Sequence, residues 1–200
     1  MTLIVSVALL KGGVSKTTTA VALAEAAALT VPTVVIDTDP MGSLARWQDL
    51  ATRGGHPLRA EVIGHAGPGL GRRIPHAAGV VVIDTPPPGA LDRSRDAIEL
   101  SDRVVMPVPP NLADLDRVQA TVEIATGYGR PAAAVLTQVR GGIEDSAAAA
   151  HWLKSSGVPV YATELPLTVA VQRAYGQALT SGPLLRFGID LMTEILKEIQ

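Results

Sequence analysis

Short runs of apolar and β-branched residues alternate with helix-like stretches along this 200-residue chain, and few folds accommodate such a pattern. Most runs are continuously apolar, which is typical of strands in a parallel sheet that helices cover on both faces. The predicted strands are Leu3–Ala8, Thr33–Asp37, Gly79–Asp84, Arg103–Val108 and Ala132–Thr137, with weaker ones at Leu58–Ile63 and Val158–Tyr161. The predicted helices are Lys16–Leu29, Ser43–Thr52, Leu91–Leu100, Ala113–Thr126, Asp145–Ser156, Val169–Thr180 and Leu184–Ile199. The sequence therefore predicts an α/β fold, a doubly wound and mostly parallel sheet with helices on both faces.

The composition predicts one globular domain over residues 1–200. Hydrophobic residues make up 47% of the chain but aromatic ones only 3%, so Val, Leu, Ile and Ala must fill the core. A net charge of −2 indicates neither a nucleic-acid nor a membrane partner. The absence of cysteine excludes thiolate metal sites and cysteine nucleophiles, and the apolar run at 3–10 lacks the features of a leader peptide. We expect a cytoplasmic protein.

The first predicted strand leads directly into LLKGGVSKTTTA, residues 9–20, which opens a helix. This order is that of a phosphate-binding loop, although the usual pattern G-x-x-x-x-G-K-[ST] would need glycine at Leu10 and Ser15. Gly12 and Gly13 permit a positive φ and a close approach to a ligand, and the free N–H groups of the helix N-terminus suit phosphate. A glycine turn before an ordinary helix is the alternative, but three threonines in one first turn are poor helix formers.

The side chains of this loop predict how it would hold a nucleotide. We expect Lys16 to reach the β- and γ-phosphates, Thr17 to offer its hydroxyl to Mg²⁺, and Thr18 to bind a further phosphate oxygen. The predicted nucleotide-binding loop comprises Gly12, Gly13, Val14, Ser15, Lys16, Thr17 and Thr18.

Acidic residues close two of the predicted strands. Asp37 and Asp39 end the strand at 33–37, in VVIDTDPMGS, and Asp84 ends the strand at 79–84, in VVVIDTPPPG. Each alone would more often be a helix cap or a turn residue. Because all three would lie at the same sheet edge as the loop, they predict a metal–phosphate site, with Asp37 and Asp84 near Mg²⁺ and Asp39 activating a water.

Three segments, KGGVSKTT at 11–18, DTDPMGS at 37–43 and VIDTPP at 82–87, resemble the nucleotide motifs of the ParA/MinD family of deviant Walker ATPases. That family's loop is K-G-G-x-x-K-[ST], so a chain that departs from the ordinary pattern satisfies this one. The resemblance covers residues 2 to about 110 and continues more loosely through VLTQVRGG at 135–142.

The resemblance implies ATP and Mg²⁺ as ligands, slow ATP hydrolysis, and roles for particular residues. It implies that Lys11 reaches across a nucleotide-sandwich homodimer to the partner's phosphates, that Asp39 positions the attacking water, and that Asp84 is the Walker B acid. Ser15 is a departure, since glycine is commonest there, and we expect it to tighten the loop. Four residues are implied as adenine contacts or pocket walls: Thr137, Gln138, Pro107 and Pro109.

The resemblance also implies a cellular role. ParA-type members bind DNA non-specifically as ATP dimers and segregate plasmids or chromosomes with a centromere-binding adaptor protein, so the ATP-bound form would associate with the nucleoid. Arg173 falls where the family often carries a basic residue and is the predicted DNA contact. MinD-type members bind membranes through a basic amphipathic tail. The tail here, residues 184–199, has a net charge of −1, so we expect it to pack on the domain and predict no membrane partner. The resemblance therefore predicts a ParA-type ATPase that drives plasmid or chromosome partition.

Two other functions remain open on these residues. A positioning ATPase for another cellular cargo would carry the same motifs. A small-molecule kinase or ligase on the same fold, similar to dethiobiotin synthetase, is the second alternative, although a site contained in one monomer gains little from Lys11. Because the chain begins almost directly with its first predicted strand, we expect no N-terminal DNA-binding domain of the kind that larger partition ATPases carry.

Overall fold

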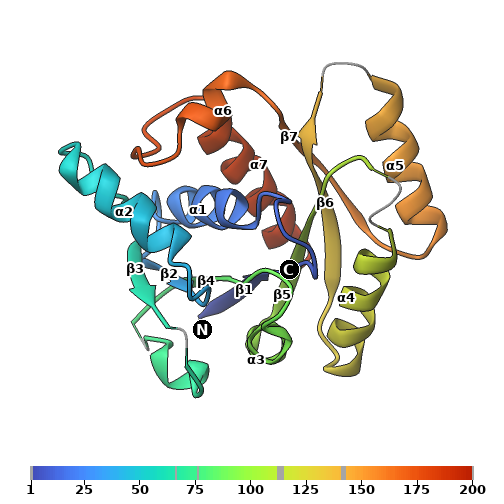
Figure 1. The fold of residues 1–200 in the computed structure, drawn as a ribbon, viewed down its shortest axis with the longest axis horizontal. Coiled ribbons are helices and arrows are strands. Elements are labelled where there is room, and N and C mark those ends of the chain that lie inside the picture. The colour runs from blue at the N-terminus through green and yellow to red at the C-terminus, as the bar shows by residue number, and fades with distance from the viewer. Residues whose placement is uncertain (1, 66, 76, 112–114, 141–142, 200) are drawn as a thin grey trace.

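The computed structural model describes residues 2–65, 67–75, 77–111, 115–140 and 143–199. Seven parallel strands form one sheet in the order β3-β2-β4-β1-β5-β6-β7 (Figure 1). The strands are β1 Leu3–Val7, β2 Thr33–Asp37, β3 Glu61–Gly64, β4 Val80–Asp84, β5 Arg103–Val108, β6 Ala132–Val139 and β7 Val160–Pro166. The α/β prediction is therefore confirmed, with every predicted strand represented.

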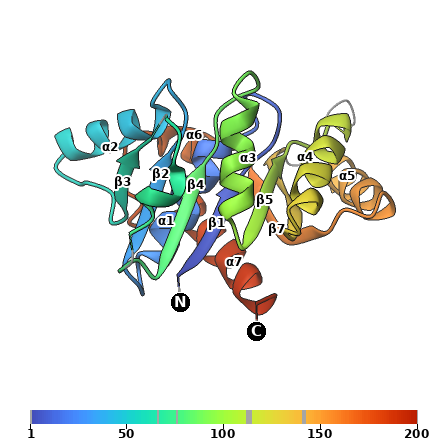
Figure 2. The ribbon, with the colours of Figure 1, turned by 90° about the horizontal axis from the view of Figure 1, so that it is seen from below.

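Helices cover both faces of the sheet (Figures 1 and 2). The helices are α1 Lys16–Ala27, α2 Ser43–Arg53, the 3₁₀ helix η1 Leu70–Arg73, α3 Leu91–Leu100, α4 Leu115–Gly127, α5 Ile143–Ser155, α6 Val169–Arg173 and α7 Pro183–Lys197. Alternate strand residues face opposite layers: Val35 packs with α1, α2 and α7, whereas Val34 and Ile36 pack with η1 and α3. The helices α4 and α5 cover β5 and β6 on the same face as α3.

Most predicted boundaries shift by one or two residues, and three elements differ by more. β3 begins at Glu61 rather than Leu58, because the preceding backbone N–H groups bind Glu25 instead of the sheet. β7 spans Val160–Pro166, whereas the predicted strand spans Val158–Tyr161. The helix predicted over 169–180 ends at Arg173, and Gly176 follows with a φ of 76°, a left-handed conformation that an α-helix does not contain. The predicted start at Ala113 and the glycines at 141–142 lie outside the described residues.

Helix α1 is buried between the sheet and α7. Its sequence KTTTAVALAEAA offers small side chains, so α7 approaches closely, and a Cβ added to Gly188 would lie 2.1 Å from the carbonyl oxygen of Ala22. The apolar face of α7 is buried, including Leu184, Leu191 and Ile195. The prediction that this tail packs on the domain is therefore confirmed. No helix among the described residues has the length and apolar character to cross a membrane.

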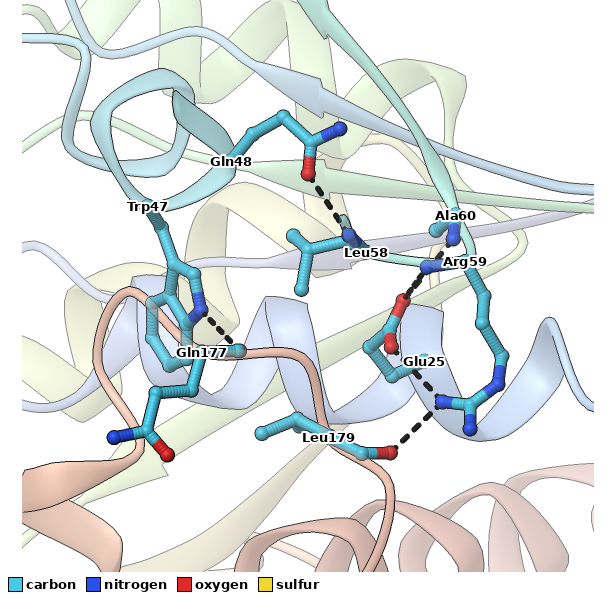
Figure 3. Close-up of polar contacts among 8 residues, drawn as sticks. All are labelled: Glu25, Trp47, Gln48, Leu58, Arg59, Ala60, Gln177 and Leu179. Atoms are coloured by element: carbon cyan, nitrogen blue, oxygen red, sulfur yellow. Dashed lines mark hydrogen bonds and ion pairs between the residues drawn. The ribbon is translucent and has the colours of Figure 1, made fainter. Parts of the chain in front are cut away.

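Buried polar contacts tie the loops to α1 and α2 (Figure 3). The fully buried Glu25 accepts hydrogen bonds from the backbone of Arg59–Ala60, and its carboxylate lies 3.2 Å from Nη1 of Arg59. The same Nη1 donates to the carbonyl of Leu179 at 2.8 Å. Trp47 Nε1 donates to the carbonyl of Gln177 at 2.9 Å. The segment between α6 and α7 is thereby attached to the layer that contains α1 and α2.

Candidate functional site

A cavity of about 200 Å³ lies at the carboxyl edge of the sheet, where β1 leads into α1 and where β2 and β4 end. This is the edge at which open parallel sheets bind ligands. Its lining residues are Gly12, Gly13, Val14, Ser15, Lys16, Thr17, Thr18, Asp39, Ser43, Thr85 and Pro87. The structure thus brings together the whole predicted loop and Asp39, and it adds three residues that the sequence reasoning missed.

The loop before α1 has two left-handed residues. Gly13 has a φ of 71°, and Ser15, the residue before the helix, has a φ of 72° and a ψ of 28°. Such a conformation costs a non-glycine residue about 1–2 kcal/mol, which explains why glycine suits this position. No side chain caps the first turn of α1, so its N–H groups are available to an anion at the cavity.

Lys16 is 8% exposed and is the first residue of α1. Its Nζ donates to the carbonyl oxygen of Lys11 at 2.6 Å. Burial lowers the pKa of Lys16, while the nearby carboxylates of Asp84 and Asp39 act in the opposite direction. A buried ammonium beside the loop is well placed to bind phosphate oxygens. Lys11 itself is partly exposed.

Asp84 ends β4 and is fully buried. Burial raises its pKa to about 7; the neighbouring Thr17 hydroxyl opposes this shift, although neither carboxylate oxygen accepts a hydrogen bond of normal geometry from the described residues. Burying two carboxylate oxygens without a hydrogen-bond partner costs free energy of folding, unless a cation or a water molecule binds them.

These residues fit Mg²⁺. The described residues contain no group of three or more His, Cys, Asp or Glu side chains that would enclose a metal ion. Mg²⁺ is commonly held by one or two protein oxygens together with waters and substrate phosphates, and Asp84 with Thr17 offers that donor set.

Asp37 binds the backbone at the start of α2. Its Oδ1 accepts from the N–H of Asp39 at 3.0 Å, and its Oδ2 accepts from Leu44 and Ala45 at 3.1 and 3.2 Å. Burial raises the pKa of Asp37, and these backbone hydrogen bonds act to lower it. The carboxylate of Asp37 therefore holds the first turn of α2, the capping role that was the alternative, and its contact with a metal stays a prediction. Asp39, partly exposed, faces the cavity.

Two threonines that the sequence reasoning missed join the strand ends. Thr38 Oγ1 donates to the carbonyl of Asp84 at 2.6 Å, and Thr85 Oγ1 donates to the carbonyl of Val7 at 2.8 Å. Both threonines are buried. They fix the spacing of β2, β4 and β1 where the acidic residues emerge. The recurring Asp-Thr pair in the sequence was the available signal.

The four residues predicted at the adenine are not among those that line the cavity. Thr137 is fully buried and donates to the carbonyl of Val14 at 3.1 Å, and Nε2 of Gln138 donates to the carbonyl of Gly13 at 2.6 Å. Pro107 is buried within β5, and Pro109 follows that strand. Thr137 and Gln138 therefore bind the loop itself here, and adenine contact by any of the four stays a prediction.

Arg173, the predicted DNA contact, is the last residue of α6 and is exposed. Its exposure suits a surface role, and its contact with DNA stays a prediction.

Comparison with known proteins agrees with this geometry. The family model described as the CobQ/CobB/MinD/ParA nucleotide binding domain matches residues 5–181. The maintenance of carboxysome distribution protein A of Gloeobacter kilaueensis is 34% identical over 176 residues, which cover 85% of this chain and 79% of that protein.

Two solved structures show the likeness of fold. MinD from Pyrococcus horikoshii, complexed with Mg-ADP, matches with a TM-score of 0.80 at 17% identity, covering all of this chain and 98% of that one. A plasmid partition protein from Borrelia burgdorferi, bound to AMPPNP, matches with a TM-score of 0.79 at 15% identity, covering 98% of this chain and 100% of that one. On the extent of the family match and the identity to the carboxysome protein, the chain belongs to the CobQ/CobB/MinD/ParA nucleotide-binding family.

Proposed function

We propose that this chain is a positioning ATPase, which binds Mg-ATP, forms an ATP-dependent homodimer and distributes a large cellular cargo. The observation that carries the proposal is the cavity at the carboxyl edge, where the glycine loop, buried Lys16 and Asp39 converge beside Asp84. Family membership supports nucleotide binding at this loop.

The chain's residues divide the work of hydrolysis. The first-turn N–H groups of α1 and Nζ of Lys16 would bind the phosphate oxygens, and Asp84 with the Thr17 hydroxyl would hold the cation. When bound, Mg²⁺ supplies positive charge that offsets the charge of the phosphates. Asp39 accepts a hydrogen bond from the N–H of Met41 on one oxygen, and its carboxylate orients the attacking water.

The identity of the cargo is the finer part of the proposal. A protein assembly is favoured over a plasmid, because the 34%-identical relative is named for carboxysome distribution. The likeness to the Borrelia plasmid partition protein, at 15% identity, supports the fold alone. Segregation of DNA with a centromere-binding adaptor is therefore the second candidate. A small-molecule kinase or ligase has less support, since that same relative is a distribution protein.

Dimerisation by Lys11 tests the proposal. In an Asp39→Ala background, which should trap the ATP-bound form, light scattering with Mg-ATP is expected to report a dimer. Adding Lys11→Ala should leave nucleotide binding intact and return the protein to a monomer, because the second lysine acts on the partner's phosphates. Lys154→Ala, a change to an exposed lysine of α5, is the matched control and should still dimerise. Equal dimerisation with and without Lys11 would favour the kinase or ligase instead.

A further inference from the structure

Two residues with unusual backbone conformations meet at the phosphate loop. Among the described residues, Ser15 and Gln138 are the only non-glycine residues with a positive φ, at 72° and 56°. They are 123 positions apart, yet Nε2 of Gln138 lies 3.2 Å from Oγ of Ser15 and 2.6 Å from the carbonyl oxygen of Gly13. Left-handed conformations of such residues persist where the surrounding structure holds them, and they concentrate at functional sites.

The end of β6 is irregular at the point where Gln138 leaves it. The pairing register between β6 and β7 shifts between Thr137 and Val139, so the residue between them is released from the regular ladder. A bulge of this kind redirects a side chain. Thr137, which is fully buried, donates to the carbonyl of Val14 at 3.1 Å. Two consecutive residues of β6 thus bind three consecutive residues of the loop, 13–15.

These contacts orient the loop's peptide groups. In a trans peptide the C=O of one residue and the N–H of the next point in opposite directions. Since the carbonyls of Gly13 and Val14 are bound by β6, the N–H groups of Val14 and Ser15 are directed away from it. Both residues line the cavity. Backbone N–H groups beside left-handed residues form the concave sites that bind anions.

We propose that Gln138 is a positioning residue that fixes the phosphate loop in its binding conformation by holding Ser15 left-handed. A glycine at position 15 would adopt this conformation without help, whereas serine needs a partner and supplies, through its hydroxyl, the acceptor for one. Ser15 and Gln138 therefore act as a coupled pair. The inference rests on the nucleotide binding proposed above and assigns Gln138 to the phosphates rather than to the base.

The experiment separates phosphate from base. Calorimetry measures the Kd of Mg-ATP and of magnesium with inorganic triphosphate, which has no base, for the wild-type chain and for Gln138→Ala. Losing the two hydrogen bonds is expected to raise the Kd of both ligands by the same factor, about five- to tenfold. Gln138→Glu, which keeps the size of the side chain but removes the donor, should weaken both at least as much. Gln172→Ala, at an exposed position of α6, is the matched control and should change neither.

Coupling is tested in a Ser15→Gly background. In that background, Gln138→Ala should raise the Kd of inorganic triphosphate by about threefold or less, because glycine adopts the left-handed conformation unaided. Thermal midpoints of all variants check that the change lies in the loop and not in global folding.

Several results would overturn the inference. A loss confined to ATP would place Gln138 at the base, and unchanged Kd values in Gln138→Ala and Gln138→Glu would remove it from the site. Equal losses with and without the Ser15→Gly change would contradict the coupling. Failure of the wild-type chain to bind either ligand would overturn the proposed function, and this inference with it.

Discussion

Lys16 and Asp84 are buried charges of opposite sign whose own surroundings leave them poorly compensated. Burial lowers the pKa of Lys16 and raises that of Asp84 to about 7, so each group is less readily charged than it would be in water. Each therefore gains free energy from a ligand of opposite charge: a phosphate at Lys16 and a divalent cation at Asp84. A magnesium nucleotide supplies both the phosphate for Lys16 and the cation for Asp84.

Separate substitutions should divide binding from hydrolysis. Lys16→Ala is expected to weaken Mg-ATP by at least about thirtyfold, since losing one partner of a buried charge pair costs about 2–5 kcal/mol. Asp39→Ala should change the Kd by less than about threefold and lower the hydrolysis rate by about a hundredfold or more. Calorimetry and phosphate release measure the two effects. Full ATPase activity in Lys16→Ala would refute the site.

Asp84 should make the ligand-free protein less stable as pH rises. Its pKa is raised from 3.8 to about 7 in the folded chain, so the folded state binds more protons than the unfolded state between these values. Its contribution to the free energy of unfolding is therefore present below about pH 4, falls between about pH 4 and 7, and is constant above. At about 1.4 kcal/mol per pKa unit, the loss is at most about 5 kcal/mol.

Substitution of Asp84 by asparagine (Asp84→Asn) tests this pH dependence. Urea unfolding without Mg²⁺ measures the free energy of unfolding of both proteins. The value for the variant minus the value for the wild type should rise from pH 4 to pH 7 and then stay level. The exposed Asp92→Asn is the control and should show no such rise. A difference independent of pH would contradict the raised pKa.

At the scale of secondary-structure elements, α1 is held by what packs on it. The helix links the phosphate loop to the core, and α7 lies against it so closely that Gly188 nearly contacts the backbone of Ala22. The alanine-rich sequence of α1 permits this approach. A small change in α7 should therefore shift α1, the helix that follows the phosphate loop.

Gly188→Ala should therefore destabilise the fold. The added Cβ would lie 2.1 Å from the carbonyl oxygen of Ala22, and relieving that overlap requires the helices to separate, at about 1–3 kcal/mol. Gly127→Ala, at the end of α4, adds a Cβ that meets nothing within 4 Å and should be neutral or slightly stabilising. Urea midpoints compare the two. Equal stabilities would show that α7 can shift freely.

Elements with a strong local pattern were predictable, and those decided by distant contacts were not. The continuous apolar run at β4 gives the strand at once, because its residues are buried on both faces. The helix predicted over 169–180 was wrong after Arg173: Gly176 takes a left-handed φ, and the Gln177 carbonyl accepts from Trp47, 130 positions away. No window of sequence contains that contact.

The candidate site divides in the same way. The loop residues were predictable because they form one continuous motif, and Asp39 was predictable because the carboxyl ends of parallel strands share one edge of the sheet. For Asp37 the sequence left a metal ligand and a helix cap open, and only the path of α2 shows that the cap contact is made. The contact of Gln138 with the loop depends on β6 and on its irregular end, which pattern reading does not resolve.

At the scale of the whole molecule, the parallel sheet separates two edges. All seven strands point the same way, so the loop, Asp39 and Asp84 gather at the carboxyl edge. The end of α7 lies at the other edge, where Nη2 of Arg103, at the start of β5, donates to the carbonyl of Glu198. Figure 2 shows the ribbon of α7 below the sheet. Surfaces that respond to nucleotide are expected near the first edge.

Non-specific DNA binding by the ATP dimer is the riskiest expectation, because the net charge of −2 per chain does not favour it. If a local basic patch that includes Arg173 compensates, duplex DNA should be retained with ATP and not with ADP. Retention should fall with about one power of salt concentration per neutralised phosphate. Arg173→Ala should weaken it, and Lys154→Ala, on α5, should not. An ATP dimer that binds no DNA at low salt would require a different track for its cargo.

The close packing of α1 bears on how the molecule would respond to a nucleotide. This helix is buried between the sheet and α7, whereas α2 buries only one face, so we expect a displacement that begins at the cavity to pass through α2. Ser43 lines the cavity and begins α2, its carbonyl accepts from the hydroxyl of Tyr175 at 3.3 Å, and the Tyr175 ring lies 5.1 Å from that of Trp47. A displacement of α2 would thus change the surroundings of the Trp47 indole. The fluorescence of Trp47 is therefore expected to change when the protein binds a nucleotide.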